Sequence, residues 1–210
     1  AKTIGSQLTN ETGYSIATDI VNNVLYVGGS VNDSTLLIKM KPDGEILWSR
    51  TFDILRESAE RVCGVIIDSD GMICVSGMTD ASTGGFTFLL KYDPDQNAVL
   101  YAKQYTSTSA NFGQFLIEKG PGGNYLICNN VTAPNDAELI EVDRNTGLIN
   151  PAFSKHYHLG SSETLHEMVL HNGRLYSTGR FSDGGTTANM RNTLIKLNPS
   201  DVSAEWIKLG

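Results

Sequence analysis

Short apolar runs of four to eight residues, bounded by clusters of Gly, Asn, Asp and Pro, recur along the chain. No segment shows a sustained helical period, and such runs are typical of antiparallel strands joined by tight turns. In the stretch from residue 62 to residue 105 the pattern predicts strands at 62–67, 72–78, 86–92 and 99–105. This stretch therefore predicts one unit of four antiparallel strands.

The second strand of this unit carries a motif that occurs four times, beginning at Leu25, Ile73, Leu126 and Leu175 with spacings of 48, 53 and 49 residues. A third-strand motif follows each copy: Leu37-Ile38-Lys39, Leu90-Lys91-Tyr92, Leu139-Ile140-Glu141 and Leu194-Ile195-Lys196. A last strand then carries an aromatic residue two positions before a basic one: Trp48 and Arg50, Tyr101 and Lys103, Phe153 and Lys155, Trp206 and Lys208. Three motifs in one order indicate an internal repeat of about fifty residues.

Units of four short strands cannot bury both of their faces alone, so they stack on their neighbours as a propeller or a solenoid. Leucine-rich repeats and parallel β-helix coils are shorter than these units, which favours propeller blades. The predicted fold is therefore all-β, a β-propeller with four four-stranded antiparallel blades in this chain. The expected blade boundaries are about 10–54, 55–107, 108–159 and 160–210.

The first residues of the chain match the last strand of a unit, because Lys2-Thr3-Ile4-Gly5 resembles Lys208-Leu209-Gly210. We expect residues 1–9 to form the outer strand of a preceding blade. Four blades closing on themselves would then have two segments competing for one outer position. A larger ring of about six to eight blades is the favoured expectation. Completion by an oligomer or a partner chain, and a true four-bladed ring, are the alternatives.

Three segments of the first unit carry a family resemblance. Residues 13–19 read Gly-Tyr-Ser-Ile-Ala-Thr-Asp, residues 23–29 read Asn-Val-Leu-Tyr-Val-Gly-Gly, and residues 39–44 read Lys-Met-Lys-Pro-Asp-Gly. These resemble the bacterial-type β-propeller repeats called SBBP, and the likeness is loosest in the third unit, where Asn129-Asn130 replaces the glycines. The resemblance implies a multi-bladed propeller, common in secreted or cell-surface proteins, with no shared catalytic motif. WD and Kelch repeats fit less well.

Charge and composition narrow the classes of partner. The formal net charge of −7, with scattered Lys and Arg, disfavours duplex nucleic-acid binding, which needs clustered cations. No apolar run approaches the roughly 20 residues of a membrane span. The three cysteines, Cys63, Cys74 and Cys128, are too few for a disulfide framework.

Asp68-Ser69-Asp70-Gly71 is the candidate metal site. Asp68 and Asp70 offer oxygen ligands at alternate positions, and Gly71 allows a sharp turn, as at the start of a calcium loop. No Glu stands at the twelfth position, and the same residues form a good hairpin turn. The turn is the favoured interpretation and calcium is the alternative; no other cofactor is predicted.

Catalytic and zinc motifs are not evident in the sequence. His156, His158, His166 and His171 lie within sixteen positions, but they fall on different predicted strands and lack the ligand spacing of a zinc site. No Gly-x-Ser-x-Gly elbow, phosphate loop or dinucleotide fingerprint occurs. The loop Gly120-Pro121-Gly122-Gly123 joins two predicted strands and is interpreted as a hairpin loop.

Two further patterns have competing interpretations. The aromatic series of Trp48, Tyr101, Phe153 and Trp206 could stack on sugars, but packing between blades is favoured. The basic residue after each aromatic would protect the outer strand against unwanted pairing. Glycosylation sequons begin at Asn10, Asn32 and Asn130, and they are usable only on exposed backbone in a secretory route.

Three functional hypotheses follow. The first is a non-catalytic scaffold or interaction module that presents loops to a protein or glycan, within a larger secreted, surface or particle-associated protein. The second is an enzyme with a site at the mouth of the central channel, formed by first-strand residues such as Asp19, Asp68, Glu118 and Glu167. The third is a glycan-binding lectin. Because a propeller fold does not define a function, the first hypothesis rests on repeats without a catalytic motif.

Overall fold

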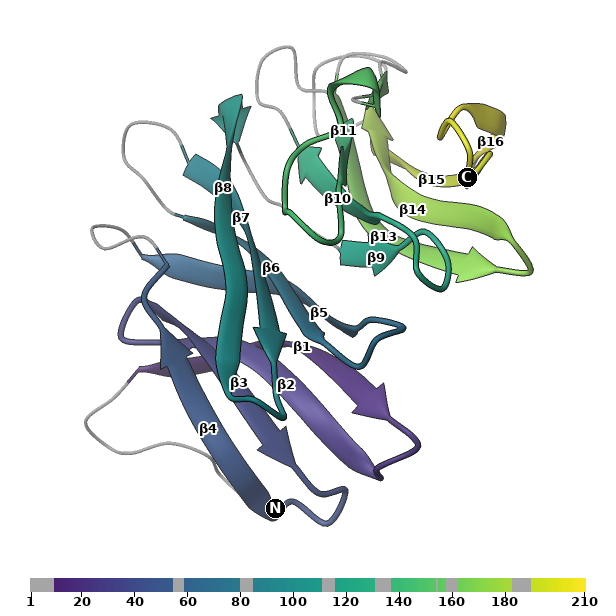
Figure 1. Ribbon diagram of the computed structural model, residues 1–210. Helices are drawn as coiled ribbons and strands as arrows, with labels where there is room; N and C mark the ends of the chain where they lie inside the picture. The colour runs from purple at the N-terminus through teal and green to yellow at the C-terminus, as the bar shows by residue number, and fades with distance from the viewer. Residues whose placement is uncertain are drawn as a thin grey trace. The chain divides into compact units, whose positions relative to one another are not determined.

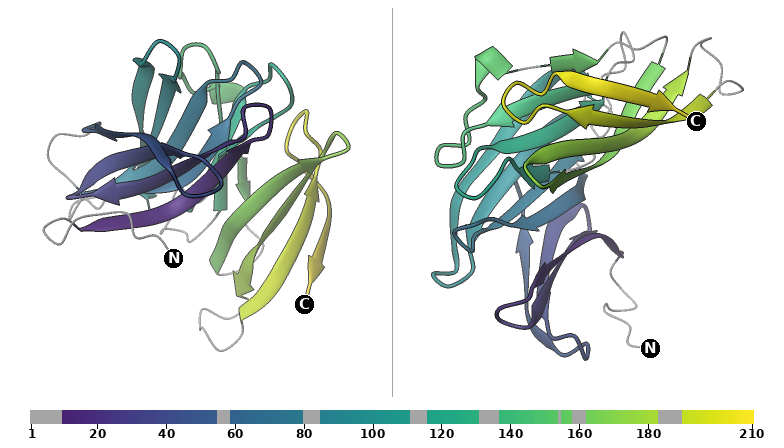
Figure 2. Two further views of the ribbon diagram at one scale, coloured as in Figure 1. Left: turned by 90° about the horizontal axis from the view of Figure 1, so that it is seen from below. Right: turned by 90° about the vertical axis from the view of Figure 1, so that its right-hand side faces the viewer.

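The computed structural model describes residues 10–54, 59–79, 85–110, 116–130, 137–153, 155–157, 162–182 and 190–210. These residues form four sheets of four strands each, in which neighbours in sequence are neighbours in the sheet (Figure 1). We call the sheets blades 1 to 4, and Figure 2 shows them in two further views. The prediction of an all-β chain with four four-stranded antiparallel sheets is confirmed. Residues 1–9, expected as an outer strand, lie outside the described part.

The chain divides into two compact units, Ala1–Tyr105 and Thr106–Gly210. Blade 1 consists of β1 (Glu11–Asp19), β2 (Val24–Val31), β3 (Ser34–Met40) and β4 (Ile46–Phe52). Blade 2 consists of β5 (Glu60–Ile67), β6 (Ile73–Thr79), β7 (Gly85–Asp93) and β8 (Ala98–Ala110). Blade 3 consists of β9 (Leu116–Glu118), β10 (Tyr125–Asn130), β11 (Ala137–Val142) and β12 (Lys155–Tyr157), with the 3-10 helix η1 (Pro151–Phe153) before β12. Blade 4 consists of β13 (Ser162–His171), β14 (Arg174–Ser182), β15 (Met190–Leu197) and β16 (Ala204–Leu209).

Residues that tolerate a positive φ make the tight turns between strands. Asn32 and Asp33 join β2 to β3 with φ of 45° and 67°, and Asn172 and Gly173 join β13 to β14 with φ of 49° and 69°. Two such residues in succession match the twist of the flanking strands. These turns fix the register of the β2–β3 and β13–β14 hairpins.

A bulge interrupts the first strand in three of the blades. The ladder register shifts between Gly13 and Ser15, between Val62 and Gly64, and between Leu165 and Glu167. The second strand places Gly29, Gly77 and Gly179 opposite these bulges. A Cβ atom at these glycines would lie 2.2, 2.4 and 2.1 Å from a first-strand carbonyl oxygen. Glycine is therefore required because the two backbones approach too closely for a side chain.

The ladder also corrects the predicted alignment of the third unit. Leu25, Ile73 and Leu175 pair with Met40, Tyr92 and Leu197 respectively, and the residue of blade 3 in this position is Tyr125, which pairs with Val142. The third copy of the motif therefore begins at Tyr125, and the alignment from Leu126 was wrong by one residue. Asn129 consequently occupies the position of the three glycines. Within the described residues, the first strand of blade 3 starts only at Leu116, so Asn129 faces no first-strand partner.

Each blade presents two faces, which we define by the residues of blade 1. Its front face carries Tyr26, Leu37 and Trp48, and its back face carries Ile16, Val27 and Ile38. The front face of blade 1 packs on the back face of blade 2, in a core formed with Val65, Ile73, Val75, Phe88, Leu90 and Tyr92. The front face of blade 3 packs on the back face of blade 4 in the same way, and this core contains Leu126, Leu139, Met168, Leu175 and Ile195. Apolar burial between successive blades is therefore the main source of stability in each unit.

Candidate functional site

The candidate calcium segment forms the turn between β5 and β6. Oδ1 of Asp68 accepts hydrogen bonds from the backbone N–H groups of Asp70 and Met72, both at 2.9 Å. Oδ2 of Asp68 lies 2.9 Å from Nζ of Lys91, and the two side chains are 0% and 5% exposed. The segment thus has the favoured turn conformation, and a cation at Asp68 would compete with the Lys91 ammonium group. Calcium binding remains a prediction.

The position of this ion pair recurs in every blade. The ladders place Asp19 with Lys39, Asp68 with Lys91, Lys119 with Glu141, and His171 with Lys196 in equivalent places. Blade 3 therefore carries the pair with its charges reversed, with Nζ of Lys119 at 2.5 Å from Oε2 of Glu141. In blade 4, Lys196 instead pairs with Glu205 at 2.7 Å. In blades 2 and 3 an ion pair at this position therefore joins the first hairpin to the third strand.

Blade 3 builds a larger polar network around this pair. Glu141 also accepts a 2.7 Å hydrogen bond from the side-chain amide of Asn124. Burial alone would raise the pKa of Glu141, but the hydrogen bonds from Lys119 and Asn124 outweigh burial and hold the pKa below its ordinary value of 4.5. The Lys119 ammonium lies 3.9 Å from the centre of the Phe153 ring, and Arg144 pairs with Glu118 at 3.1 Å. Each of the two carboxylates thus contacts a cation of its own blade, which is suited to fixing a hairpin.

The four acidic residues proposed for a channel-mouth site do not occupy one equivalent position. Asp19 and Asp68 share a place at the end of the first strand, Glu118 lies one residue earlier, and Glu167 lies beside the bulge. Hydrogen bonds from Asn22 hold the pKa of Asp19 below its ordinary value. Oε1 of Glu167 accepts a 3.1 Å hydrogen bond from the N–H of Met168. Each carboxylate thus has a partner within its own blade.

Each of the described histidines has different neighbouring side chains. Nε2 of His156 lies 3.5 Å from Glu138, and the His171 ring contacts Asn172 at 3.1 Å. Burial and the charge of Arg180 lower the pKa of His166. His158 lies outside the described residues. In the part of the chain that the structure describes, no three His, Cys, Asp or Glu residues gather to hold a metal ion.

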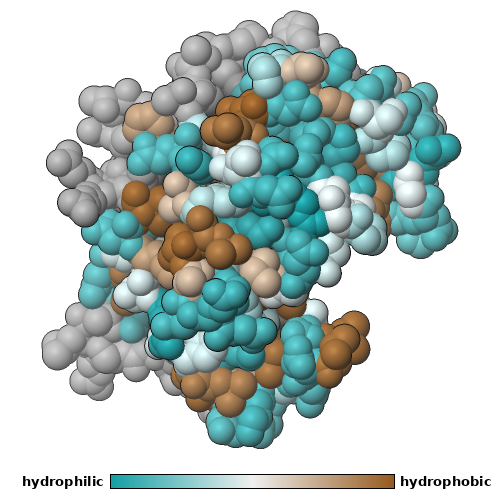
Figure 3. Space-filling view, viewed as in Figure 1, coloured by the Kyte–Doolittle hydropathy of each residue, from teal (hydrophilic) through white to brown (hydrophobic). Residues whose placement is uncertain are grey.

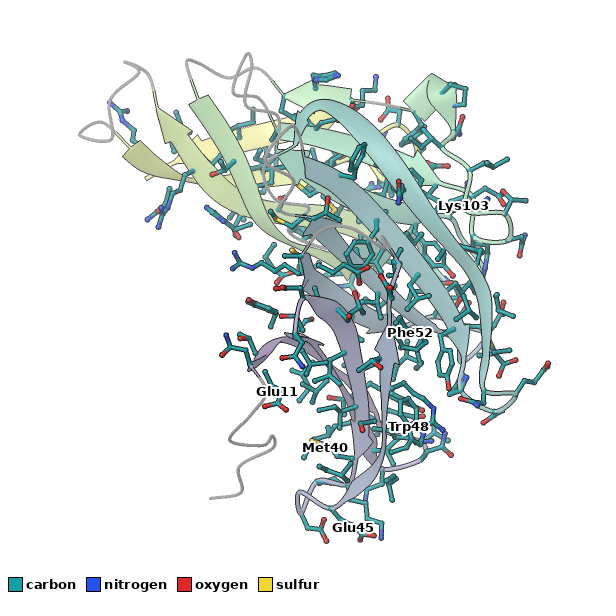
Figure 4. All side chains as sticks on the ribbon, turned by 90° about the vertical axis from the view of Figure 1, so that its left-hand side faces the viewer. Glu11, Met40, Glu45, Trp48, Phe52 and Lys103 are labelled. Atoms are coloured by element: carbon teal, nitrogen blue, oxygen red, sulfur yellow. The ribbon has the colours of Figure 1, made fainter. Side chains whose placement is uncertain are left out.

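Trp48 and Phe153 of the aromatic series pack as the favoured interpretation expects. Trp206 instead contacts Tyr176 within blade 4, with the ring centres 6.4 Å apart. Trp48 lies 5.9 Å from Tyr26 within blade 1 and 5.9 Å from Tyr92 of blade 2, measured between ring centres. Figure 4 shows Trp48 and Phe52 on the side of blade 1 that meets blade 2. Phe153 packs against the core of the second unit. Tyr101 is half-buried on β8.

The structure describes the side chains of two of the three sequon asparagines, Asn10 and Asn32. Asn10 and Asn32 are exposed and lie side by side, because the N–H of Asn10 donates to Oδ1 of Asn32 at 3.3 Å. The backbone N–H of Asn32 donates in turn to the carbonyl oxygen of Asn10 at 3.2 Å. The side chain of Asn130 lies outside the described part. Glycosylation remains a prediction at all three positions.

A glutamate that sequence reasoning missed joins blades 1 and 2. Glu60 begins β5 and is 3% exposed. Its Oε2 accepts a 2.9 Å hydrogen bond from the N–H of Thr35, and its Oε1 accepts a 2.6 Å bond from the N–H of Ile54. The ladders place Glu11 and Glu163 at the same position in blades 1 and 4. The signal in the sequence that identifies this position is the Glu that recurs before the first-strand bulges of blades 1, 2 and 4.

The front face of blade 4 is the strongest candidate for a binding surface. It forms an open hollow of about 610 Å³, lined mainly by His166, Thr178, Arg180, Asn192, Leu194 and Lys208. Apolar residues reach solvent here, with Leu194 39% exposed and Val169, on the neighbouring part of the sheet, 54% exposed. The equivalent residues of blade 1, Leu37 and Ala17, belong to or pack against the core with blade 2. Blade 4 therefore exposes a face of the type that blade 1 buries.

The back face of blade 1 is hollowed as well. A smaller cavity of about 110 Å³ is lined by Glu11, Val27, Leu36 and Ile38 together with three neighbours on β1 and β2. Ile16 on this face is 60% exposed, whereas the equivalent Val65 of blade 2 is 5% exposed. Figure 4 shows Glu11 and Met40 on the opposite side of blade 1 from Trp48 and Phe52. In the view of Figure 3, hydrophobic residues reach the surface in several separate patches.

Comparison with known proteins supports the fold. No family model and no curated protein matches the chain. Among solved structures, it is similar to the Dos1 propeller, with a TM-score of 0.59 and 11% identity over 95% of this chain and 47% of that one. It is also similar to the exo-β-1,3-galactanase 1,3Gal43A of Clostridium thermocellum, with a TM-score of 0.57 and 16% identity over 92% of this chain and 47% of that one. A GH43 β-1,3-galactosidase solved with galactodeoxynojirimycin gives a TM-score of 0.58 and 9% identity, over 91% and 74%.

The chain is built of β-propeller blades. It spans about half the length of the first two of these structures, and identities at this level define the fold alone. Within the described residues, no helix is long and apolar enough to cross a membrane. Among the described residues, the back face of blade 1 and the front face of blade 4 both carry exposed apolar side chains.

Proposed function

We propose that this chain is a non-catalytic β-propeller scaffold that presents blade surfaces and loops to a protein or glycan partner. The observation that carries the proposal is the exposed front face of blade 4, where Val169 is 54% and Leu194 is 39% exposed. Exposed apolar surface rimmed by polar residues marks interaction sites. Arg180, Asn192 and Lys208 supply that polar rim. The surface is therefore suited to a partner that buries apolar area and supplies acceptors or negative charge.

The arrangement of the ionisable groups supports a structural role for them. Asp68, Glu118 and Glu141 each face a cation at 3.1 Å or less, in positions that tie hairpins to the third or neighbouring strand. A general acid or base instead needs a proton that it can exchange with substrate. The ion pairs of these three carboxylates therefore support a structural role for them.

The wider setting follows from the resemblance to SBBP repeats. We propose that the chain acts within a larger secreted, cell-surface or particle-associated protein. Exposed Asn10 and Asn32 fit such a location, since their sequons lie on accessible backbone.

A photoreactive residue can test the proposal in cells of the source organism. Thr178 lies on the front face of blade 4, and Asn172 lies in the exposed turn of the same blade. A benzophenone side chain at position 178 should form a defined protein or glycan adduct that the same group at position 172 does not form. Equal adducts at both positions, or none at position 178, would contradict an interaction surface on this face.

The enzyme and lectin alternatives need separate measurements. Incubation of the purified chain with glycan mixtures, followed by mass spectrometry of the products, tests for cleavage. Turnover that persists after repurification would overturn the non-catalytic part of the proposal. A glycan array decides between a protein partner and a glycan partner, because a lectin should bind a defined subset of glycans and a protein scaffold none.

A further inference from the structure

The turn between β13 and β14 contains Asn172-Gly173, which is the one Asn-Gly pair in the sequence. Both residues are exposed and have positive φ values of 49° and 69°. The two strands pair directly beside the turn, where His171 lies opposite Arg174. Among the described residues, the side-chain amide of Asn172 makes its polar contact with the ring of its neighbour His171, with Nδ2 3.1 Å from Nε2. This side chain is therefore held by its own turn and not by a distant segment of the described chain.

The backbone nitrogen of Gly173 is accessible for reaction. Glycine has no side chain that would hinder approach to its own nitrogen. A Cβ atom built at Gly173 would have no neighbour within 4 Å, so the surroundings leave this space open as well. In the part of the chain that the structure describes, the N–H group of Gly173 donates no hydrogen bond. Attack of this nitrogen on Cγ of Asn172 would close a five-membered ring, which is favoured because the two groups belong to adjacent residues.

We infer that Asn172 is a site of spontaneous deamidation and isomerisation. In the first step, the Gly173 nitrogen loses its proton to solvent and forms a bond to Cγ of Asn172. The bond between Cγ and Nδ2 breaks, and the side-chain nitrogen leaves as ammonia with a proton returned by solvent. Water then opens the resulting succinimide at either carbonyl group and leaves aspartate or isoaspartate. The steps together consume one water and release one ammonia, and this chemistry is independent of the proposed function.

Three other asparagines in the same left-handed region provide an internal comparison. Each is followed by a residue that has a side chain: Asn23-Val24, Asn32-Asp33 and Asn97-Ala98. Such a side chain crowds the attacking nitrogen, which glycine leaves open. Asn97 is also restrained, because its Oδ1 accepts hydrogen bonds from Nε of Arg50 at 3.0 Å and from the hydroxyl of Tyr92 at 2.6 Å. Asn172 should therefore react first among these four residues.

Isoaspartate would change the turn itself, because the chain then runs through the side-chain carbon and gains one methylene group. A two-residue hairpin turn fixes the register of its strands, so an extra backbone atom disturbs the pairing beside it. Leu170 pairs with Leu175 one position beyond the pair of His171 and Arg174. Leu175 is fully buried in the core with blade 3, and Leu170 packs against that core. Isomerisation should therefore weaken the packing of blade 4 on blade 3.

Peptide mapping of the folded chain tests the reaction. The chain is kept in mildly alkaline buffer, which favours proton loss from Gly173, and samples taken over time are cleaved with trypsin. The tryptic peptide 156–174 contains Asn172 and no other side-chain amide, so a gain in mass identifies this residue. This peptide should gain the mass difference between amide and acid before peptide 92–103, which contains Asn97. An isoaspartyl methyltransferase with a labelled methyl donor should label the same peptide.

The variant Gly173→Asn tests the role of the unhindered nitrogen. It adds a side chain but keeps a residue type that tolerates positive φ, as the turn at Asn32 and Asp33 shows with φ of 45° and 67°. It should slow the reaction at Asn172 by roughly tenfold. Equal rates in the parent and in this variant, or an earlier reaction at Asn97, would overturn the inference.

The variant Asn172→Gly tests the structural consequence, because it removes the reacting amide and still accepts the positive φ. Its urea midpoint should stay constant during the incubation, whereas that of the parent should fall as isoaspartate accumulates. A parent that accumulates isoaspartate without a lower midpoint would refute the effect on blade 4. Photocrosslinking at position 178 tests the scaffold proposal separately, so the two can fail independently.

Discussion

Replacing Glu60 should destabilise the packing of blade 1 on blade 2, because its carboxylate accepts hydrogen bonds from two backbone N–H groups of the neighbouring blade. The bonds from Thr35 and Ile54 measure 2.9 and 2.6 Å, and Glu60 is 3% exposed. Hydrogen bonds to a charged group contribute about 1.5–3 kcal/mol each. Glu60→Gln keeps one acceptor oxygen, so it should lower the free energy of unfolding of the first unit by about 2 kcal/mol. Glu60→Ala loses both bonds and should cost about 3–5 kcal/mol.

Tryptophan fluorescence during urea unfolding measures this effect, since Trp48 contacts residues of both blades. Trp206→Phe removes the second tryptophan, so the signal comes from the first unit alone. Glu45→Gln is the matched control, because Glu45 makes an ion pair with Lys41 that is exposed to solvent, and such pairs contribute little to stability. Unfolding free energies of both Glu60 variants within 0.5 kcal/mol of the parent would refute the argument from the two hydrogen bonds.

Three further perturbations address the blades individually. Gly77→Ala places a Cβ atom 2.4 Å from the carbonyl oxygen of Arg61. The substitution should lower the free energy of unfolding, measured with urea, by at least about 2 kcal/mol. An unchanged urea midpoint would contradict the close approach of the two backbones. Asp68→Lys should lower the free energy of unfolding by about 3–5 kcal/mol. Adding Lys91→Glu should recover more than half of this loss, because blade 3 carries the same pair with its charges reversed. A double variant without recovery would show that the two positions are not equivalent. The pKa of Glu141 is lower in the folded protein than its ordinary value of 4.5. The stability that ionised Glu141 gives the folded protein is therefore complete above pH 4.5 and is lost as the pH falls through the folded pKa. Glu141→Gln should accordingly make the thermal unfolding temperature less sensitive to acid.

Strand chemistry and the repeat were accessible from the sequence. Apolar runs, turn residues and three motifs in constant order predicted four antiparallel blades, since strand period and turn geometry are local properties. The alignment failed by one residue on the third strand of the second unit, where Leu89 rather than Leu90 is equivalent to Leu37. It also failed by one residue in the third unit, where Tyr125 rather than Leu126 is equivalent to Leu25. Both residues are apolar, so composition could not separate the two registers. The cross-strand partner Val142 decides between them.

The roles of individual polar residues were less accessible. Glu11, Glu60 and Glu163 recur before the first-strand bulges, but their recurrence gives no partner until the neighbouring blade is placed. The partners of Glu60 are the backbone N–H groups of residues 35 and 54. Almost any residue type at these two positions would offer the same N–H group. A contact of this kind leaves no residue-type signal on the donating side, because every residue except proline has a backbone N–H group.

The sequence by itself determined the all-β class, the repeat of about fifty residues and the turn at Asp68, because alternation of apolar residues and turn propensity act over a few residues. Only the tertiary structure decided that Asp68 pairs with Lys91, that the same pair is reversed at Lys119 and Glu141, and that blade 4 exposes what blade 1 buries. These features join residues that are distant along the chain. Their energies depend on burial and on the neighbouring blade, and both exist only after the blades have packed.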